Sequence, residues 1–84
     1  MSSFRYARGV VFRREPAGGI LFNVDTGDIQ VVEGVAFGIC DMMDKGKTRE
    51  QILLELRKKY PDEPNLESDL DQFISELKGK GALE

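Results

Sequence analysis

GGILFNVDTGDIQVVE, residues 18–33, predicts two short strands joined by a tight turn. The runs Ile20–Val24 and Asp28–Val32 are rich in β-branched and aromatic residues, which fit the half-buried surface of a sheet. Between them lies the tripeptide DTG, in which Gly27 suits the left-handed conformation that closes a short hairpin. The stretch therefore predicts a β-hairpin.

A further strand precedes this hairpin. Gly9–Glu15 contains Val10, Val11 and Phe12, and the residues EPAG at 15–18 have turn chemistry, because proline presets φ and glycine tolerates positive φ. Three short strands joined by tight turns form an antiparallel meander. In that meander Asp28–Val32 lies at one edge.

The hydrophobic period changes after Gly34, from that of a strand to that of a helix. Apolar residues recur on one face of this predicted helix, which ends at DKG, residues 44–46: Val35, Ala36, Ile39, Cys40 and Met43.

Thr48 begins the next predicted helix with a capping box, in which its hydroxyl accepts one free N–H and Gln51 reaches back to another. Glu55 and Lys59 lie one turn apart and can pair. Pro61 ends the helix, because proline disfavours helical geometry in the residue before it. The apolar face consists of Ile52, Leu53, Leu56 and Tyr60.

Asn65 is expected to cap the last helix, and Gly79 and Gly81 are expected to stop it. Its apolar residues are Leu66, Leu70, Phe73, Ile74 and Leu77. An order of strands first and helices afterwards indicates an α+β fold with the helices packed on one face of a small sheet. We expect residues 1–84 to form a single domain with a modest core.

The composition argues against several classes of function. The formal net charge is −3, whereas a free-standing nucleic-acid binder normally has a basic surplus. The single cysteine excludes an intrachain disulfide and suits a reducing cytoplasm. The N-terminus lacks the apolar run of a signal peptide, and no apolar stretch is long enough to span a membrane. We therefore expect a cytoplasmic protein with no nucleic-acid partner and no membrane partner.

The reactive side chains are too few for catalysis. The chain has no histidine, which removes the commonest general base and the commonest neutral metal ligand. Cys40 falls on the apolar face of a predicted helix, where it behaves as a small hydrophobe. Gly18-Gly19 precedes a strand rather than a helix, and the phosphate-loop pattern is absent. We predict no catalytic residue and no metal site.

The edge strand Asp28–Val32 is the main candidate for a binding site. Natural edges are usually blocked by charge, proline or a bulge, and here only Asp28 and Glu33 stand at the ends. An extended peptide could add to this edge as a fourth strand. The alternative is an idle edge, as in many small domains.

The last helix offers a second element for such a site. Asp69, Phe73 and Glu76 are spaced by four and three positions and so share one stripe. They could form the wall of a groove whose acids attract a basic peptide. The alternative is an ordinary solvated face.

The run from Gly18 to Tyr60 and the later LESDLDQFISELKGKGAL resemble PqqD-like proteins, also called RiPP precursor peptide recognition elements. The resemblance is carried by the patterns Thr48/Ile52/Leu56, Asp69/Phe73/Leu77 and Gly81/Leu83. The opening RGVVFRREPAGGILFN also looks like the mycofactocin-type members. The family often has Leu-Asn entering the first helix and an aromatic residue near its middle, where this chain has Val32-Glu33 and Cys40.

The resemblance implies a winged-helix-like domain, in which a three-stranded antiparallel sheet is followed by a three-helix bundle. It implies that the domain binds the leader of a ribosomally made precursor peptide antiparallel to the third strand and against the third helix. The domain would then present the precursor to a modifying enzyme, commonly a radical S-adenosylmethionine (radical SAM) enzyme, and carry no cofactor itself. On this basis we expect the peptide-binding residues to be Asp28, Ile29, Gln30, Val31, Val32, Asp69, Gln72, Phe73 and Glu76.

Two other functions stay open. A winged-helix DNA-binding protein would need a basic recognition helix where this chain has the acidic LESDLDQFISELK. A structural subunit could dimerise through the free edge, so that a monomer and a weak homodimer are both compatible with the sequence. The face of the third strand that lines the groove is open too, since a one-residue shift exchanges Gln30 and Val32 for Ile29 and Val31.

Overall fold

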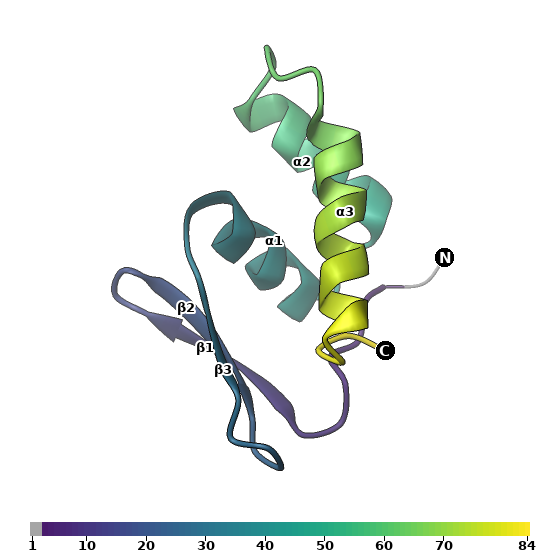
Figure 1. The fold of residues 1–84 in the computed structure, drawn as a ribbon. Coiled ribbons are helices and arrows are strands. Elements are labelled where there is room, and N and C mark those ends of the chain that lie inside the picture. The colour runs from purple at the N-terminus through teal and green to yellow at the C-terminus, as the bar shows by residue number, and fades with distance from the viewer. Residues whose placement is uncertain (1–2) are drawn as a thin grey trace.

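The computed structural model describes residues 3–84, and within them three strands precede three helices (Figure 1). The elements are β1 Val10–Glu15, β2 Gly18–Asn23, β3 Ile29–Val32, α1 Gly34–Asp44, α2 Arg49–Lys59 and α3 Leu66–Gly79. The predicted α+β class is confirmed. Residues 1 and 2 of the predicted domain lie outside the described residues.

The sheet is antiparallel in the order β1-β2-β3, so β2 is central and β3 is an edge strand. The β2–β3 turn is held by local hydrogen bonds: the Asn23 Oδ1 accepts from the N–H groups of Asp25 (2.9 Å) and Thr26 (3.2 Å). Gly27 has φ +80°, the left-handed conformation that the sequence predicted. The third strand begins at Ile29, one residue later than predicted, although the Asp28 carbonyl still accepts from the Asn23 N–H at 2.9 Å.

The core lies between one face of the sheet and the helices (Figure 1). Leu21 and Val32 are the buried apolar residues that the strands contribute. Cys40, at 0% exposure, belongs to this core as predicted, and desolvation raises the pKa of its thiol to about 11. The helices complete the core with Ile39, Met43, Ile52, Leu53, Leu56, Leu66, Leu70, Ile74 and Leu77.

The helix ends follow local chemistry, with two corrections. The capping box is confirmed: the Gln51 N–H donates to the Thr48 hydroxyl (3.2 Å), and the Thr48 N–H donates to the Gln51 side chain (2.9 Å). Asn65 precedes α3, but its side chain makes no capping hydrogen bond, because its backbone (φ −107°, ψ 16°) lacks the extended conformation that aims such a side chain. Gly79 remains helical, and Gly81, at φ +77°, follows the end of α3.

A further correction concerns charge pairing on α2. Glu55 pairs with Lys58 at 3.7 Å rather than with the predicted Lys59. Both lysines lie about one turn beyond Glu55, and the i+3 neighbour takes the contact.

The two ends of the described chain pair with each other (Figure 1). The Ala7 N–H donates to the Ala82 carbonyl at 2.9 Å, and the Glu84 N–H donates to the Arg5 carbonyl at 3.0 Å. Tyr6 then reaches inward, and its hydroxyl donates to the Cys40 carbonyl on α1 at 2.7 Å. The N-terminal segment therefore closes one end of the core.

No helix within residues 3–84 is both long enough and apolar enough to cross a membrane.

Candidate functional site

The two edges of the sheet differ in how they are guarded. β1 carries Arg13, Arg14 and Glu15, and Arg14 is held by Asp41 and Asp44 on α1. The sequence of β3 is IQVV, which contains no charge and no proline. Since charge and proline are common devices that prevent unwanted strand pairing, β3 is the open edge of this sheet.

The register of the hairpin determines which backbone groups are free at that edge. The Asn23 N–H bonds to the Asp28 carbonyl, so these two residues form a hydrogen-bonded pair. Hydrogen-bonded and non-hydrogen-bonded pairs alternate along an antiparallel ladder. The residues Gln30 and Val32 therefore direct their backbone groups toward β2, whereas Ile29 and Val31 direct their N–H and C=O groups outward.

The side chains of β3 divide between the two faces of the sheet. Gln30 and Val32 lie on the face toward the helices, and Val32 is only 2% exposed. Ile29 and Val31 lie on the outer face and are 61% and 69% exposed. The side chain of Val32 is thus part of the core, and the residues of β3 that a partner could touch are Ile29, Gln30 and Val31.

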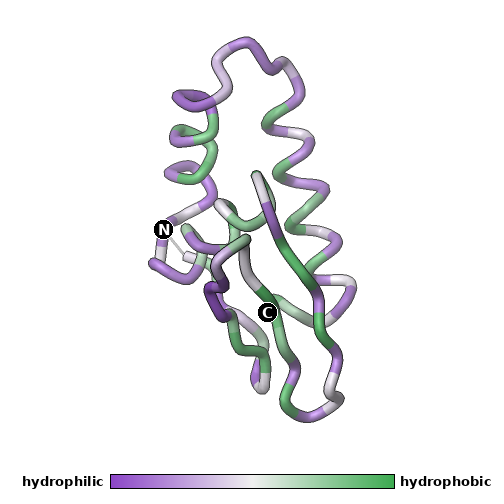
Figure 2. The backbone as a smooth tube through the Cα atoms, turned by 90° about the vertical axis from the view of Figure 1, so that its left-hand side faces the viewer, coloured by the Kyte–Doolittle hydropathy of each residue, from purple (hydrophilic) through white to green (hydrophobic). Residues whose placement is uncertain are grey.

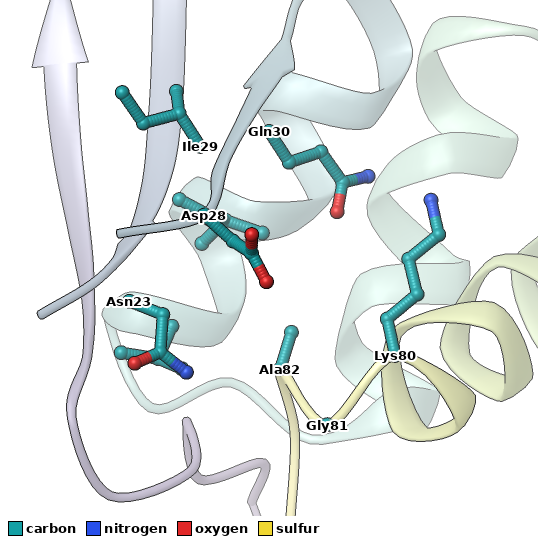
Figure 3. A pocket seen from close by; sticks show the side chains of 9 residues that line it. Asn23, Asp28, Ile29, Gln30, Lys80, Gly81 and Ala82 are labelled. Carbon is teal, nitrogen blue, oxygen red and sulfur yellow. The ribbon is translucent and has the colours of Figure 1, made fainter. Parts of the chain in front are cut away.

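An open pocket of about 410 Å³ lies beside the beginning of β3 (Figure 3). Its apolar lining includes Val10, Leu21 and Ala82, which belong to β1, β2 and the C-terminal segment. Gln30 and Lys80 extend toward each other across it in Figure 3. Asn23, Asp28, Ile29 and Gly81 complete the lining.

Of the predicted site residues, this pocket brings together Asp28, Ile29 and Gln30. The four predicted residues of α3 do not line it. Lys80, which directly follows α3 and which the sequence did not predict as a site residue, lines the pocket instead. The spacing contained the signal for it, because Lys80 follows Glu76 by four positions and so continues the stripe of Asp69 and Phe73.

That stripe defines one side of α3. Asp69 and Glu76 are exposed, and Phe73, between them, is half-buried against the core. Gln72 is exposed and lies about 100° around the helix from Phe73, so it borders the stripe rather than belonging to it.

The opposite side of α3 is occupied by a second charge cluster. Arg49 at the start of α2 donates to Glu67 (2.8 Å) and Asp71 (2.7 Å). The Arg49 hydrogen bond and charge hold the pKa of the Asp71 carboxyl below its usual range. Two of the acids in the predicted acidic helix therefore pair with α2, which leaves Asp69 and Glu76 on the stripe that continues to Lys80.

The arrangement contains features that suit peptide binding. Within residues 3–84, no group of three or more His, Cys, Asp or Glu side chains is placed to hold a metal ion. The thiol of Cys40 is fully buried, which removes it from contact with a substrate. A free strand edge, an apolar pocket and a helix stripe with charges are the components of an extended-peptide site.

Comparisons with known proteins agree with this fold. A search of curated protein sequences finds no match. A solved structure described as "Lasso peptide synthetase B1 complexed with the leader peptide" superposes with a TM-score of 0.87 at 19% sequence identity, over 99% of each chain. The family model described as coenzyme PQQ synthesis protein D (PqqD) matches residues 18–83, from the first residue of β2 to the buried Leu83. The chain therefore belongs to the PqqD family.

Proposed function

We propose that this chain is a non-enzymatic chaperone that binds the leader of a ribosomally synthesised precursor peptide. The leader adds antiparallel to β3 as a fourth strand, and the chain presents the precursor to a radical SAM maturase. The observation that carries the proposal is the uncharged open edge of β3, where Ile29 and Val31 direct backbone groups outward beside an open pocket. Membership of the PqqD family and the structural likeness to lasso peptide synthetase B1 in complex with its leader peptide support it.

Each part of the site has its own task in this proposal. Ile29 and Val31 supply main-chain hydrogen bonds, which give affinity without selecting a sequence. The pocket bordered by Asp28 and Gln30 takes one apolar side chain of the leader, because Val10, Leu21 and Ala82 are part of its lining. Val32 contributes by anchoring the strand in the core.

The stripe on α3 forms the wall, with Phe73 as its apolar contact and Asp69, Gln72 and Glu76 as its polar contacts. Asp69 and Glu76, which are exposed acids, favour basic residues in the leader. The wall on α3 thus recognises the charge of leader side chains, whereas the edge of β3 binds the leader backbone.

The absence of histidine and the burial of the lone thiol support a role without catalysis. In this proposal the maturase performs the modification and holds any cofactor that the reaction needs. The chain itself holds none.

A displayed library of random twelve-residue peptides, selected on the purified chain, tests the proposal. We expect enriched peptides to slow amide hydrogen exchange at Ile29 and Val31. Gln30 and Val32 serve as internal controls, because their N–H groups already point toward β2. A selection that enriches no peptide, or a bound peptide that leaves the exchange of Ile29 and Val31 unchanged, would contradict strand addition.

Calorimetry with an enriched peptide tests the helix wall. Phe73→Ala and Asp69→Lys are expected to weaken binding, and Asp62→Lys is the matched control, since Asp62 is an exposed acid in the loop before α3. Equal affinity for all three variants would remove α3 from the site.

A further inference from the structure

The outer face of β3 has an unusual composition for a surface strand. An antiparallel sheet covered on one face normally alternates apolar residues inward with polar residues outward. Here the outward residues are Ile29 and Val31, and the inward residue between them is the polar Gln30. The tube in Figure 2 is accordingly green, or hydrophobic, over long stretches of the sheet.

These two residues continue an apolar surface that begins on the central strand. Val31 pairs with Ile20, and Ile29 pairs with Phe22, so all four side chains lie on the outer face. Ile20 and Phe22 are half-buried, whereas Ile29 and Val31 are the most exposed large apolar side chains of the described chain. Exposure therefore rises toward the free edge.

The opposite edge of the same face differs. There β1 places Val11 opposite Phe22 and the charged Arg13 opposite Ile20. Val11 is 43% exposed, less than either residue of β3. The most exposed apolar side chains of this face thus lie at the edge whose backbone groups are free.

The hydrogen-bond pattern connects the two observations. A strand that bonds to the outward groups of Ile29 and Val31 places its own residues directly opposite them, with side chains on the same face. The peptide residue between these two lies opposite Gln30 and points toward the pocket and Lys80. The side chains of one added strand would therefore alternate: some would cover the outer row, which consists of Ile29 and Val31, and those between them would fill the pocket.

We propose that Ile29 and Val31 determine peptide specificity, and that the ligand carries β-branched or aromatic side chains at two positions separated by one residue, facing this row. The inference rests on the proposed function and deepens it, because it assigns a sequence requirement to the face that points away from the groove. A leader for this chain is apolar at both of these outer positions as well as at the inner position that enters the pocket. Cross-strand pairs of this kind strengthen binding by roughly 2- to 30-fold when two are present.

Parallel selections from a displayed library of random twelve-residue peptides test the inference. The wild-type chain should enrich apolar residues at two positions spaced by two. Ile29→Lys/Val31→Lys should shift the preference at those same two positions to Asp and Glu, while the preference at the residue between them stays unchanged. Val11→Lys on the other edge of the same face is the matched control and should reproduce the wild-type preferences.

The double lysine variant should fold, because both positions are mostly exposed, and circular dichroism checks this. If it does not fold, Ile29→Thr/Val31→Thr replaces it, with a loss of the apolar preference at the two outer positions as the expected result. Enrichment of peptides with the same outer preferences by the wild type and the folded variant would overturn the inference and leave leader binding intact. Ile29 and Val31 could instead serve self-association. In that case the wild type would form a dimer, the variant would not, and both would enrich peptides with the same preferences; this result would also overturn the inference. If neither chain enriches peptides, the proposed function itself fails.

Discussion

Substituting proline at two adjacent positions of β3 should have opposite consequences. Val31→Pro removes an N–H that points to the open edge, whereas Gln30→Pro removes an N–H that points to the Leu21 carbonyl on β2. Proline is compatible with an edge strand only where its missing N–H faces away from the neighbouring strand. We therefore expect Val31→Pro to remain folded but to bind peptide more weakly, and Gln30→Pro to lose stability.

The magnitudes follow from the geometry. Val31 is 69% exposed, so replacing it forfeits at most about a third of the roughly 1.5–3 kcal/mol that full burial of such a side chain contributes, or about 0.5–1 kcal/mol. Gln30→Pro loses a ladder hydrogen bond of about 1 kcal/mol and leaves a buried carbonyl unsatisfied, at about 1–3 kcal/mol more. A domain of this size has a total free energy of unfolding of about 4–13 kcal/mol, so the second change removes a large share of it.

Val31→Pro, which is the milder change for stability, should be a severe change for peptide binding. Val31→Pro deletes one of the hydrogen bonds that an added strand would make, at about 0.5–1.5 kcal/mol. Its ring also projects into the space of a strand that lies only about 4.8 Å away. The combined effect on the dissociation constant should be at least about tenfold.

Urea denaturation measures the stability of both variants, and calorimetry with a peptide selected on the wild-type chain measures the affinity of Val31→Pro. Val11→Lys is the control for a general effect of changing the outer face. If Gln30→Pro were the stable variant and Val31→Pro the unstable one, the assignment of outward backbone groups would be wrong. If Val31→Pro stayed folded and bound the peptide with wild-type affinity, strand addition at β3 would be refuted.

Three further predictions concern the scaffold. Leu77→Ala should lower the free energy of unfolding by about 2–5 kcal/mol in urea denaturation, because Leu77 is fully buried and its truncation leaves a cavity; a smaller loss would indicate that α3 packs less closely than described. Thr48→Ala should cost about 1 kcal/mol through loss of the capping box, and the conservative Thr48→Ser should retain most of it. Tyr6→Phe should lower the melting temperature by roughly 4–8 °C for the loss of about 1 kcal/mol, since it deletes the hydrogen bond to the Cys40 carbonyl. Burial raises the pKa of Tyr6, so its contribution is complete below the ordinary tyrosine pKa near 10 and declines as the pH rises above it; the difference between wild type and Tyr6→Phe should narrow there, and a constant difference would contradict this assignment.

Local chemistry made much of the scaffold predictable. The DTG turn, the capping box at Thr48 and the change of period after Gly34 each act over a few neighbouring residues, so their structural consequences could be inferred before any packing was known. Local rules failed at the start of α3. Asn65 is a good capping residue by type, but the backbone conformation before α3 leaves its side chain without a capping bond.

The candidate site could be predicted only in part. The sequence indicated the edge strand and the stripe on α3, because both are periodic patterns within one element. It missed Lys80 and the pocket, whose lining joins Val10, the β2–β3 hairpin and the residues after α3. Segments that are distant in the sequence meet there only when the chain folds.

The sequence by itself determined the order of the elements, the turns between the strands and the absence of histidine. It left open which face of β3 points inward, because Ile29 and Val31 are as apolar as Val32, and strand periodicity distinguishes faces only when one of them is polar. Tertiary structure decided this: Val32 enters the core with Leu21, so Ile29 and Val31 must face outward. Burial of one side chain thus selected both the exposed row and the free backbone groups of the open edge.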